Sequence, residues 1–250
     1  MNPGTGERKS AARRTAWLPQ KKRRAALPFL FVNMAMTADG KIATANRSVS
    51  SFGSPRDHEY LLELRATADA VMAGARTVDL NRINMGPGPL RFRRRRLRDG
   101  LAEFNLRVIV SRSGSVNPRS EVFRHRFSPL VILTTRRAST ARLQALGAVA
   151  DEVKVCGAKE IDFARALRWL RKKWKVRRLL AEGGGELNDA LFRAGLVDKL
   201  HLTVCPLVFG GRAAPTIAEG VGAPTLAKAA QLHLKSMRRI GDEMYLVFFR

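Results

Sequence analysis

The sequence has few of the residues that disulfide frameworks and metal centres require. Its two cysteines, Cys156 and Cys205, form no CxxC pair, and its four histidines show no HxxxH or HxE spacing. A disulfide framework and a metal site are therefore not expected, and a reducing cytoplasm is the expected location. The P-loop and GxSxG motifs are absent too, which leaves chemistry in which a cofactor supplies the reactive atom.

Long hydrophobic runs and acidic residues are scarce as well. No stretch approaches the roughly 18 apolar residues of a membrane-spanning helix, so no membrane association is expected. The 250 residues include 46 lysines and arginines against 21 acidic residues, a net charge of +25. Two segments carry about half of this excess: residues 1–27 have eight basic side chains and one acidic side chain, and residues 91–98 (RFRRRRLR) have six arginines.

Neither basic segment shows the apolar periodicity of a packed element. We therefore predict a disordered tail over residues 1–27, for which a transit peptide is an alternative, and an arginine-rich surface loop over residues 91–98. Nucleic acid would be attracted by this charge, but no interleaved aromatic residues and no helix-turn-helix pattern accompany it. Nucleic-acid binding through the tail is thus an alternative that the sequence does not favour.

From residue 28 onward, short apolar runs alternate with helical patterns. Ser54, Pro55 and Asp57 together form a capping-box signal for a helix start. The alternation predicts a single α/β domain over residues 28–250, with a mainly parallel central sheet, antiparallel C-terminal strands and helices on both faces. Strands are expected at 29–36, 68–74, 106–111, 129–135, 148–155, 176–182, 200–210, 225–236 and 243–250, and helices at 55–67, 138–146, 160–174 and 186–195.

Several polar or glycine-rich positions lie where strands of this pattern end. Gly183, Gly184 and Gly185 separate a strand from a helix, an arrangement that suits either a tight turn or a bound pyrophosphate. Glu182 ends the same strand, where open α/β sheets bind ligands, although a solvent-exposed acid is the alternative. Asn33 lies inside the first strand and Asp39 in the turn after it, so each has a structural reading beside a functional one.

Six segments in the same order resemble the reductase domain of riboflavin biosynthesis. This is the family of 5-amino-6-(5-phosphoribosylamino)uracil reductases, within the dihydrofolate-reductase-like fold. The matching segments are AMTADGKIA (35–43), LRATADAVMAGARTV (64–78), RVIVS (107–111), LLAEGGGELNDAL (179–191), GLVDKLHL (195–202) and PLVFGG (206–211).

The resemblance implies a homodimeric enzyme that uses NADPH to reduce the ribosyl C1′ of a phosphorylated pyrimidine. A preference for NADPH over NADH also agrees with the basic surface. It implies substrate contacts from Arg65 and Glu182. To these we add Asn33, inside the first strand, as a candidate substrate contact, and Asp39 and Glu182 as the candidate catalytic residues, with Asp39 the nearest candidate for a proton donor. The cofactor contacts that the resemblance implies are Ala35, Ser51, Thr77, Asn81, Ser111, Gly184, Gly185, Glu186 and Leu187.

Some positions depart from the family pattern. Asn33 stands where many members carry lysine, Asn81 stands where many carry an acid, and residues 82–89 match poorly. The zinc deaminase motifs HxE and PCxxC, found in many fused members, do not occur. Two alternatives therefore stay open: a dihydrofolate-reductase-like enzyme with another heterocyclic substrate, and a polyanion-binding protein that uses the fold as a scaffold.

Overall fold

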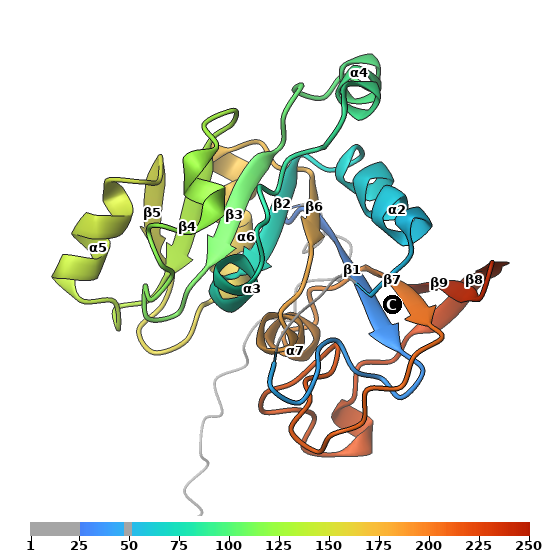
Figure 1. Ribbon diagram of the computed structural model, residues 1–250. Coiled ribbons are helices and arrows are strands. Elements are labelled where there is room, and N and C mark those ends of the chain that lie inside the picture. Colours follow the sequence, from blue (N-terminus) through green and yellow to red (C-terminus); the bar gives the residue numbers. More distant parts are fainter. Residues whose placement is uncertain (1–25, 48–51) are drawn as a thin grey trace, which may run out of the picture.

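A twisted sheet forms the centre of the protein, and β1 (Phe29–Thr37) lies inside it (Figure 1). The computed structural model describes residues 26–47 and 52–250. Within these ranges nine strands follow the order β5-β4-β3-β2-β6-β1-β7-β9-β8. The other strands are β2 (Ala70–Gly74), β3 (Leu106–Val110), β4 (Leu130–Thr134), β5 (Glu152–Val155), β6 (Arg178–Ala181), β7 (Lys199–Cys205), β8 (His233–Ile240) and β9 (Glu243–Phe249).

Strand direction divides the sheet into two parts. The pairs from β5 through β7 are all parallel, whereas β9 runs antiparallel to β7 and β8 antiparallel to β9. The predicted fold class, a mainly parallel sheet with antiparallel C-terminal strands, is confirmed. The parallel part places the carboxyl ends of β1, β2, β3 and β6 at one edge of the sheet.

Helices cover both faces of the sheet, as predicted. The helices are α2 (Pro55–Arg65), α3 (Ala75–Leu80), α4 (Leu90–Arg98), α5 (Thr140–Gly147), α6 (Phe163–Lys173) and α7 (Gly185–Arg193). Leu167 of α6 and Leu187 of α7 belong to the core cluster that contains Leu30 and Val32 of β1. Phe31 points the other way, because side chains alternate along a strand. It belongs to a second cluster with Leu64 of α2, Val78 of α3 and Leu146 of α5.

The start of α2 follows the predicted signal only in part. Pro55 opens the helix, and the Ser54 hydroxyl accepts a hydrogen bond from the Asp57 amide at 3.2 Å. The Asp57 carboxylate does not complete a capping box, because the Ser54 amide donates instead to Glu243 Oε1 at 2.7 Å. A residue of β9 therefore closes the cap of α2.

The prediction of a surface loop over residues 91–98 is wrong, because these residues lie in α4. Phe92 packs against Leu62 and Ala66, and Arg96 is fully buried. The Arg96 guanidinium donates to the carbonyl oxygens of Arg65 and Ala68, at 2.8 and 2.6 Å, and to that of Ala102 at 2.8 Å. Arginine is a good helix former. Arg96 occupies a buried position where the apolar periodicity of a helix would call for an aliphatic residue, so the sequence pattern did not indicate this helix.

The C-terminal elements also differ from the prediction. The strand expected at 225–236 is a short 3₁₀ helix (Leu226–Lys228) followed by β8, and the strand expected at 200–210 ends at Cys205. The helix α3 and the 3₁₀ helix Glu121–Arg124 were not predicted. All eight residues of β8 are exposed, so no alternation of apolar and polar residues marks where this strand begins. No helix of the described ranges is long and apolar enough to cross a membrane.

Candidate ligand-binding site

A cavity of about 1430 Å³ opens at the carboxyl edge of the parallel strands. It is larger than the 300–1,000 Å³ usual for small-molecule pockets, so it has room for a dinucleotide beside a second ligand. Open α/β sheets bind their ligands at this edge. Its lining includes Asn33, Met34 and Ala35 of β1, Gly74 at the end of β2, Ser111 after β3, Glu182 after β6 and the first turn of α7.

The glycines after β6 let the backbone approach whatever fills the cavity. Gly183 and Gly184 have φ angles of +84° and +86°, a region that side chains with a Cβ rarely adopt. A Cβ on Gly185 would lie 2.8 Å from the Thr216 carbonyl oxygen, so only glycine fits there. Among the described residues, no side chain caps the start of α7. Free amides and the helix dipole thus make this turn suitable for an anionic group.

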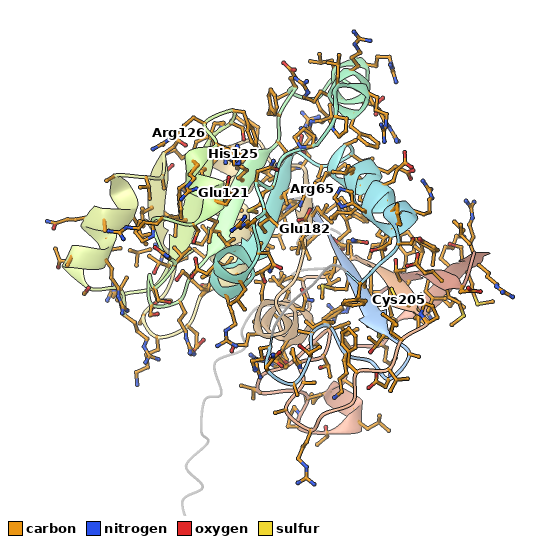
Figure 2. The ribbon with its side chains drawn as sticks, in the orientation of Figure 1. Arg65, Glu121, His125, Arg126, Glu182 and Cys205 are labelled. Atoms are coloured by element: carbon orange, nitrogen blue, oxygen red, sulfur yellow. The ribbon has the colours of Figure 1, made fainter. Side chains whose placement is uncertain are left out.

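Arg65 and Glu182 form a buried ion pair beside these glycines (Figure 2). Arg65 Nε and Nη2 donate to the two oxygens of Glu182 at 2.5 and 2.6 Å, and Nη1 donates to the Gly86 carbonyl oxygen at 2.9 Å. Both side chains are 8% exposed. The predicted substrate residues Arg65 and Glu182 are thus brought together. All three guanidinium nitrogens bind protein oxygens, so Arg65 is not free to grip a phosphate while the pair is closed.

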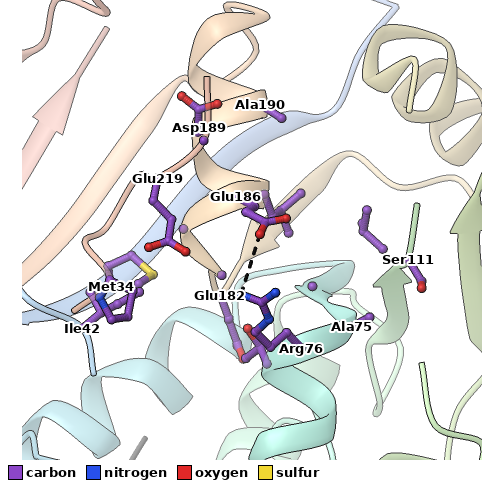
Figure 3. Close-up of a pocket in the computed structure, with 18 of the residues that line it drawn as sticks. Met34, Ile42, Ala75, Arg76, Ser111, Glu182, Glu186, Asp189, Ala190 and Glu219 are labelled. Atoms are coloured by element: carbon purple, nitrogen blue, oxygen red, sulfur yellow. Dashed lines mark ion pairs between the residues drawn. The ribbon is translucent and has the colours of Figure 1, made fainter. Parts of the chain in front are cut away.

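The other arginines that line the cavity are also paired with carboxylates. Arg76 and Glu186, on the first turns of α3 and α7, lie 3.7 Å apart, and both side chains are mostly exposed (Figure 3). The charges of the lining are therefore largely balanced, and the strong positive charge of the chain is not gathered here. The remaining pairs are Arg47–Glu219 at 2.8 Å, Arg112–Glu160 at 2.7 Å and Arg193–Asp189 at 2.8 Å.

Three polar side chains of the lining have unused hydrogen-bonding atoms, and two of them are neutral. Asn33 Oδ1 and Ser111 Oγ, like Asp57 Oδ1, are buried and have no partner among the described residues. Buried polar atoms normally have a partner, so these atoms fit a bound ligand. Asn33 and Ser111 were predicted as ligand contacts, Asn33 for the substrate and Ser111 for the cofactor. The other predicted residues that line the same cavity are Ala35, Thr77, Asn81, Gly184, Gly185, Glu186 and Leu187.

Asp39 does not lie among the residues that line the cavity. Its carboxylate accepts hydrogen bonds from the Thr37 hydroxyl at 2.5 Å and from the Phe209 and Gly210 amides at 3.2 and 2.7 Å. The Thr37 hydrogen bond lowers the pKa of Asp39. Asp39 thus joins its own turn to the segment after β7. Ser51, the remaining predicted contact, lies outside the described residues.

Some lining residues received no role from the sequence. Pro215, Glu219, Gly220 and Val221 reach the cavity from the segment between β7 and β8. Asp57, on the first turn of α2, also lines it. In the sequence Asp57 has the signal of a capping residue and no signal of ligand binding. Its neighbours across the cavity come from distant strands, so only the folded structure identifies it.

A parallel α/β sheet with a glycine-lined cavity at its carboxyl edge defines a class of proteins that bind phosphorylated ligands there. Within this class the comparison with known families is specific. Residues 28–246 match the model of the RibD C-terminal domain, and the chain belongs to that family. The family expected from the sequence is therefore confirmed.

Individual relatives agree with this membership. The 2,5-diamino-6-ribosylamino-4(3H)-pyrimidinone 5′-phosphate reductase of Methanothermobacter thermautotrophicus is 31% identical over 228 residues, which cover 88% of this chain and 97% of the relative. The protein of the same name from Archaeoglobus fulgidus is 32% identical, over 77% of this chain and 87% of the relative. A pyrimidine reductase-like protein from Corynebacterium diphtheriae has the same fold, with a TM-score of 0.75, 21% identity and coverage of 93% and 94%.

Proposed function

We propose that this protein is an NADPH-dependent reductase of riboflavin biosynthesis. Its substrate in this proposal is 2,5-diamino-6-ribosylamino-4(3H)-pyrimidinone 5′-phosphate, and its product is the corresponding ribitylamino compound. The observation that carries the proposal is the cavity in which the buried Arg65–Glu182 pair lies beside the glycine-lined start of α7. Two ligands, one held at each of these places, fit its volume of about 1430 Å³.

The residues of the cavity suit a nicotinamide dinucleotide. The first turn of α7, with Gly184, Gly185 and Leu187, would hold the pyrophosphate, because free amides and the helix dipole favour an anion. The unpartnered Ser111 hydroxyl and the neighbouring Thr77 would supply further polar contacts. When bound, such a cofactor supplies the hydride, and the protein's task is to align the ligands and exclude water.

Glu182 and Asn33 are the proposed substrate contacts. Arg65 orients the Glu182 carboxylate, whose oxygens can also accept hydrogen bonds from the amino groups of a pyrimidine. The resemblance implied the uracil form of the substrate or its equivalent before deamination, and the names of the two curated relatives favour the second, the diamino form. We therefore propose that reduction precedes deamination for this protein.

The test of this function is cofactor oxidation by the purified protein, followed by NADPH absorbance. We expect oxidation that depends on the diaminopyrimidinone phosphate, with kcat/KM at least about tenfold higher than for the aminouracil phosphate. Glu182→Gln should abolish it. Glu121→Gln, a change in the 3₁₀ helix at a partly buried residue outside the cavity lining (Figure 2), should not. Turnover of the uracil form alone contradicts the proposed order, and no turnover of either substrate contradicts the function.

A homodimer in the cytoplasm completes the proposal. The strand β8 pairs only with β9 in the described sheet, and its other edge is free (Figure 1). It exposes Leu234 and Met237, the latter by 64%. The unpaired backbone N–H and C=O groups of such an edge strand can form hydrogen bonds with a strand of another chain. Light scattering is expected to give a dimer that Met237→Lys weakens, and a monomeric wild-type protein contradicts the dimer. The two cysteines are free and buried, which suits a reducing compartment.

A further inference from the structure

The carboxylate of Asp57 has an unusual position in the cavity. Asp57 lies on the first turn of α2 and lines the cavity together with Asn33, Arg65 and Glu182. Its Oδ1 is buried and has no hydrogen-bond partner within the described ranges. A Cβ added to Gly53 would lie only 2.4 Å from Asp57 Oδ2, so any larger residue at position 53 would clash with this carboxylate. Gly53 therefore leaves the space in which this carboxylate sits.

Asp57 also differs from most acidic residues of the cavity lining in its ion pairing. Glu182, Glu186, Asp189, Glu219 and Glu160 are each paired with an arginine, and the Asp162 carboxylate caps α6 by accepting from the Arg165 amide. No ion pair to Asp57 occurs in the part of the chain that the structure describes. An unpaired carboxylate in a cavity is costly when charged, so it tends to keep its proton.

The surroundings of Asp57 act mainly in the same direction. Burial raises the pKa of Asp57, and the negative charge of Glu243 on β9 raises it further. The Thr203 hydroxyl on β7 and the neighbouring His58 lower it, but the net change is upward. The other titratable groups that interact with Asp57 are Tyr60, Cys205 and Tyr245, none of which carries a positive charge.

The proposed reaction needs a proton donor in the cavity that Asp57 lines. Reduction of the ring-opened imine form of the substrate adds a hydride to C1′ and a proton to the exocyclic nitrogen. The electron pair of the C=N bond moves onto that nitrogen, and the nicotinamide is oxidised by two electrons. Asp39 lies outside the cavity lining, and both oxygens of Glu182 accept from Arg65. Neither is placed to deliver the proton.

We propose that Asp57 is the general acid of this reduction. This inference rests on the proposed function. As C1′ receives the hydride, the Asp57 O–H bond breaks and its proton passes to the exocyclic nitrogen. Water then returns a proton to the carboxylate before the next turnover. The first turn of α2 thus contributes the acid, and its last turn contributes Arg65, which orients Glu182.

The test is the pH dependence of kcat for the wild type, Asp57→Asn and Asp57→Glu. A general acid works while protonated, so wild-type kcat should fall as pH rises through the pKa of Asp57. Asp57→Asn should lower kcat about 100-fold or more and remove this dependence. Asp57→Glu should restore part of the rate, with the dependence moved along the pH axis. Glu59→Gln, a change on the exposed side of α2, should match the wild type.

Cofactor affinity and thermal stability separate this role from a structural one. Asp57→Asn should bind NADPH within about twofold of the wild type and melt at the same or a higher temperature, because a buried unpaired carboxylate is replaced by a neutral amide. Wild-type turnover with an unchanged rate or pH profile in Asp57→Asn overturns the proposal while leaving the function intact. Loss of NADPH binding or of folding in Asp57→Asn, with no pH-dependent rate in Asp57→Glu, also overturns it. An inactive wild type overturns the function and this inference together.

Discussion

Ser54 and Glu243 are 189 residues apart in the sequence and are joined by two hydrogen bonds. The Ser54 amide donates to Glu243 Oε1 at 2.7 Å, and the Ser54 hydroxyl donates to Oε2 at 2.6 Å. The Tyr245 hydroxyl also donates to Oε2, at 2.6 Å. The antiparallel end of the sheet therefore fixes the start of the helix that brings Asp57 and Arg65 to the cavity.

Removal of the Glu243 carboxylate should loosen this junction. Glu243→Ala leaves the Ser54 amide and the Tyr245 hydroxyl without their acceptor in a buried place, so we expect the free energy of unfolding to fall by about 2–4 kcal/mol. Urea denaturation measures the change. Asp242→Ala is the matched control, because the adjacent carboxylate is 79% exposed and pairs with the exposed Arg239. Equal stability of the two variants would falsify the clamping role of Glu243.

The Arg65–Glu182 pair should behave as one unit in a double-mutant cycle. Arg65→Met or Glu182→Leu alone strands a buried charge and should cost about 3–5 kcal/mol of stability. The double variant should cost less than the sum of the two, by about 0.5–3 kcal/mol. Chemical denaturation of all four proteins gives the coupling. The half-exposed pair Lys173–Glu152, 2.7 Å apart, serves as the reference and should couple by less than about 1 kcal/mol. Additive effects at Arg65 and Glu182 contradict the prediction.

Gly185 should not tolerate even one added methyl group. In Gly185→Ala the new Cβ would lie 2.6 Å from Glu219 Cγ and 2.8 Å from the Thr216 carbonyl oxygen. We expect a loss of about 1–3 kcal/mol of stability and at least about tenfold weaker NADPH binding, because the start of α7 must shift. Thermal melting and cofactor titration measure the two effects. Gly147→Ala, where a Cβ meets nothing within 4 Å, should change neither.

Acid should destabilise the protein partly through His201. Burial, with Lys199 and Arg178 nearby, lowers the pKa of His201 to about 3. In the unfolded chain the imidazole of His201 binds a proton near pH 6.5, whereas in the folded protein it stays neutral down to about pH 3. The free energy of unfolding therefore falls as pH drops from about 6.5 toward 3, by up to ~1.4 kcal/mol per pH unit. The Tyr60 hydroxyl and His201 Nδ1 are hydrogen-bonded at 2.6 Å. His201→Gln, which keeps a hydrogen-bonding side chain beside this hydroxyl, should remove this part of the slope, whereas His233→Gln on the exposed β8 should keep it. An identical slope in both variants runs against the prediction.

Local patterns in the sequence were sufficient for much of the fold. The buried strand around Leu30 and Val32, the helix after Pro55 and the glycines at 183–185 each follow from neighbouring residues. The cavity could also be expected at the carboxyl edge of the strands. These features depend on periodicity and turn chemistry, which a single sequence contains.

Contacts between segments that are far apart in the chain could not be predicted from the sequence. Arg65 and Glu182 are 117 residues apart, and nothing near either residue indicates that they pair. Arg96 was assigned to a solvent-exposed run because its burial depends on three carbonyl oxygens that the fold brings around it. Asp57 appeared as a capping residue for the same reason. The contact predicted for Ser51 stays a prediction.

The position of β1 in the sheet has a consequence for how the chain is made. Phe29 pairs with Arg178 of β6, and Phe31 pairs with Lys199 of β7, so both partners of this early strand come late in the sequence. The strand β2 likewise meets β6 and not β1. During translation one edge of the apolar segment FLFVNMAMT therefore stays unpaired until the ribosome has released Ala181, the end of β6, and the other edge until it has released Cys205, the end of β7. Nascent chains that stall earlier carry an open hydrophobic strand and are candidates for aggregation or chaperone capture.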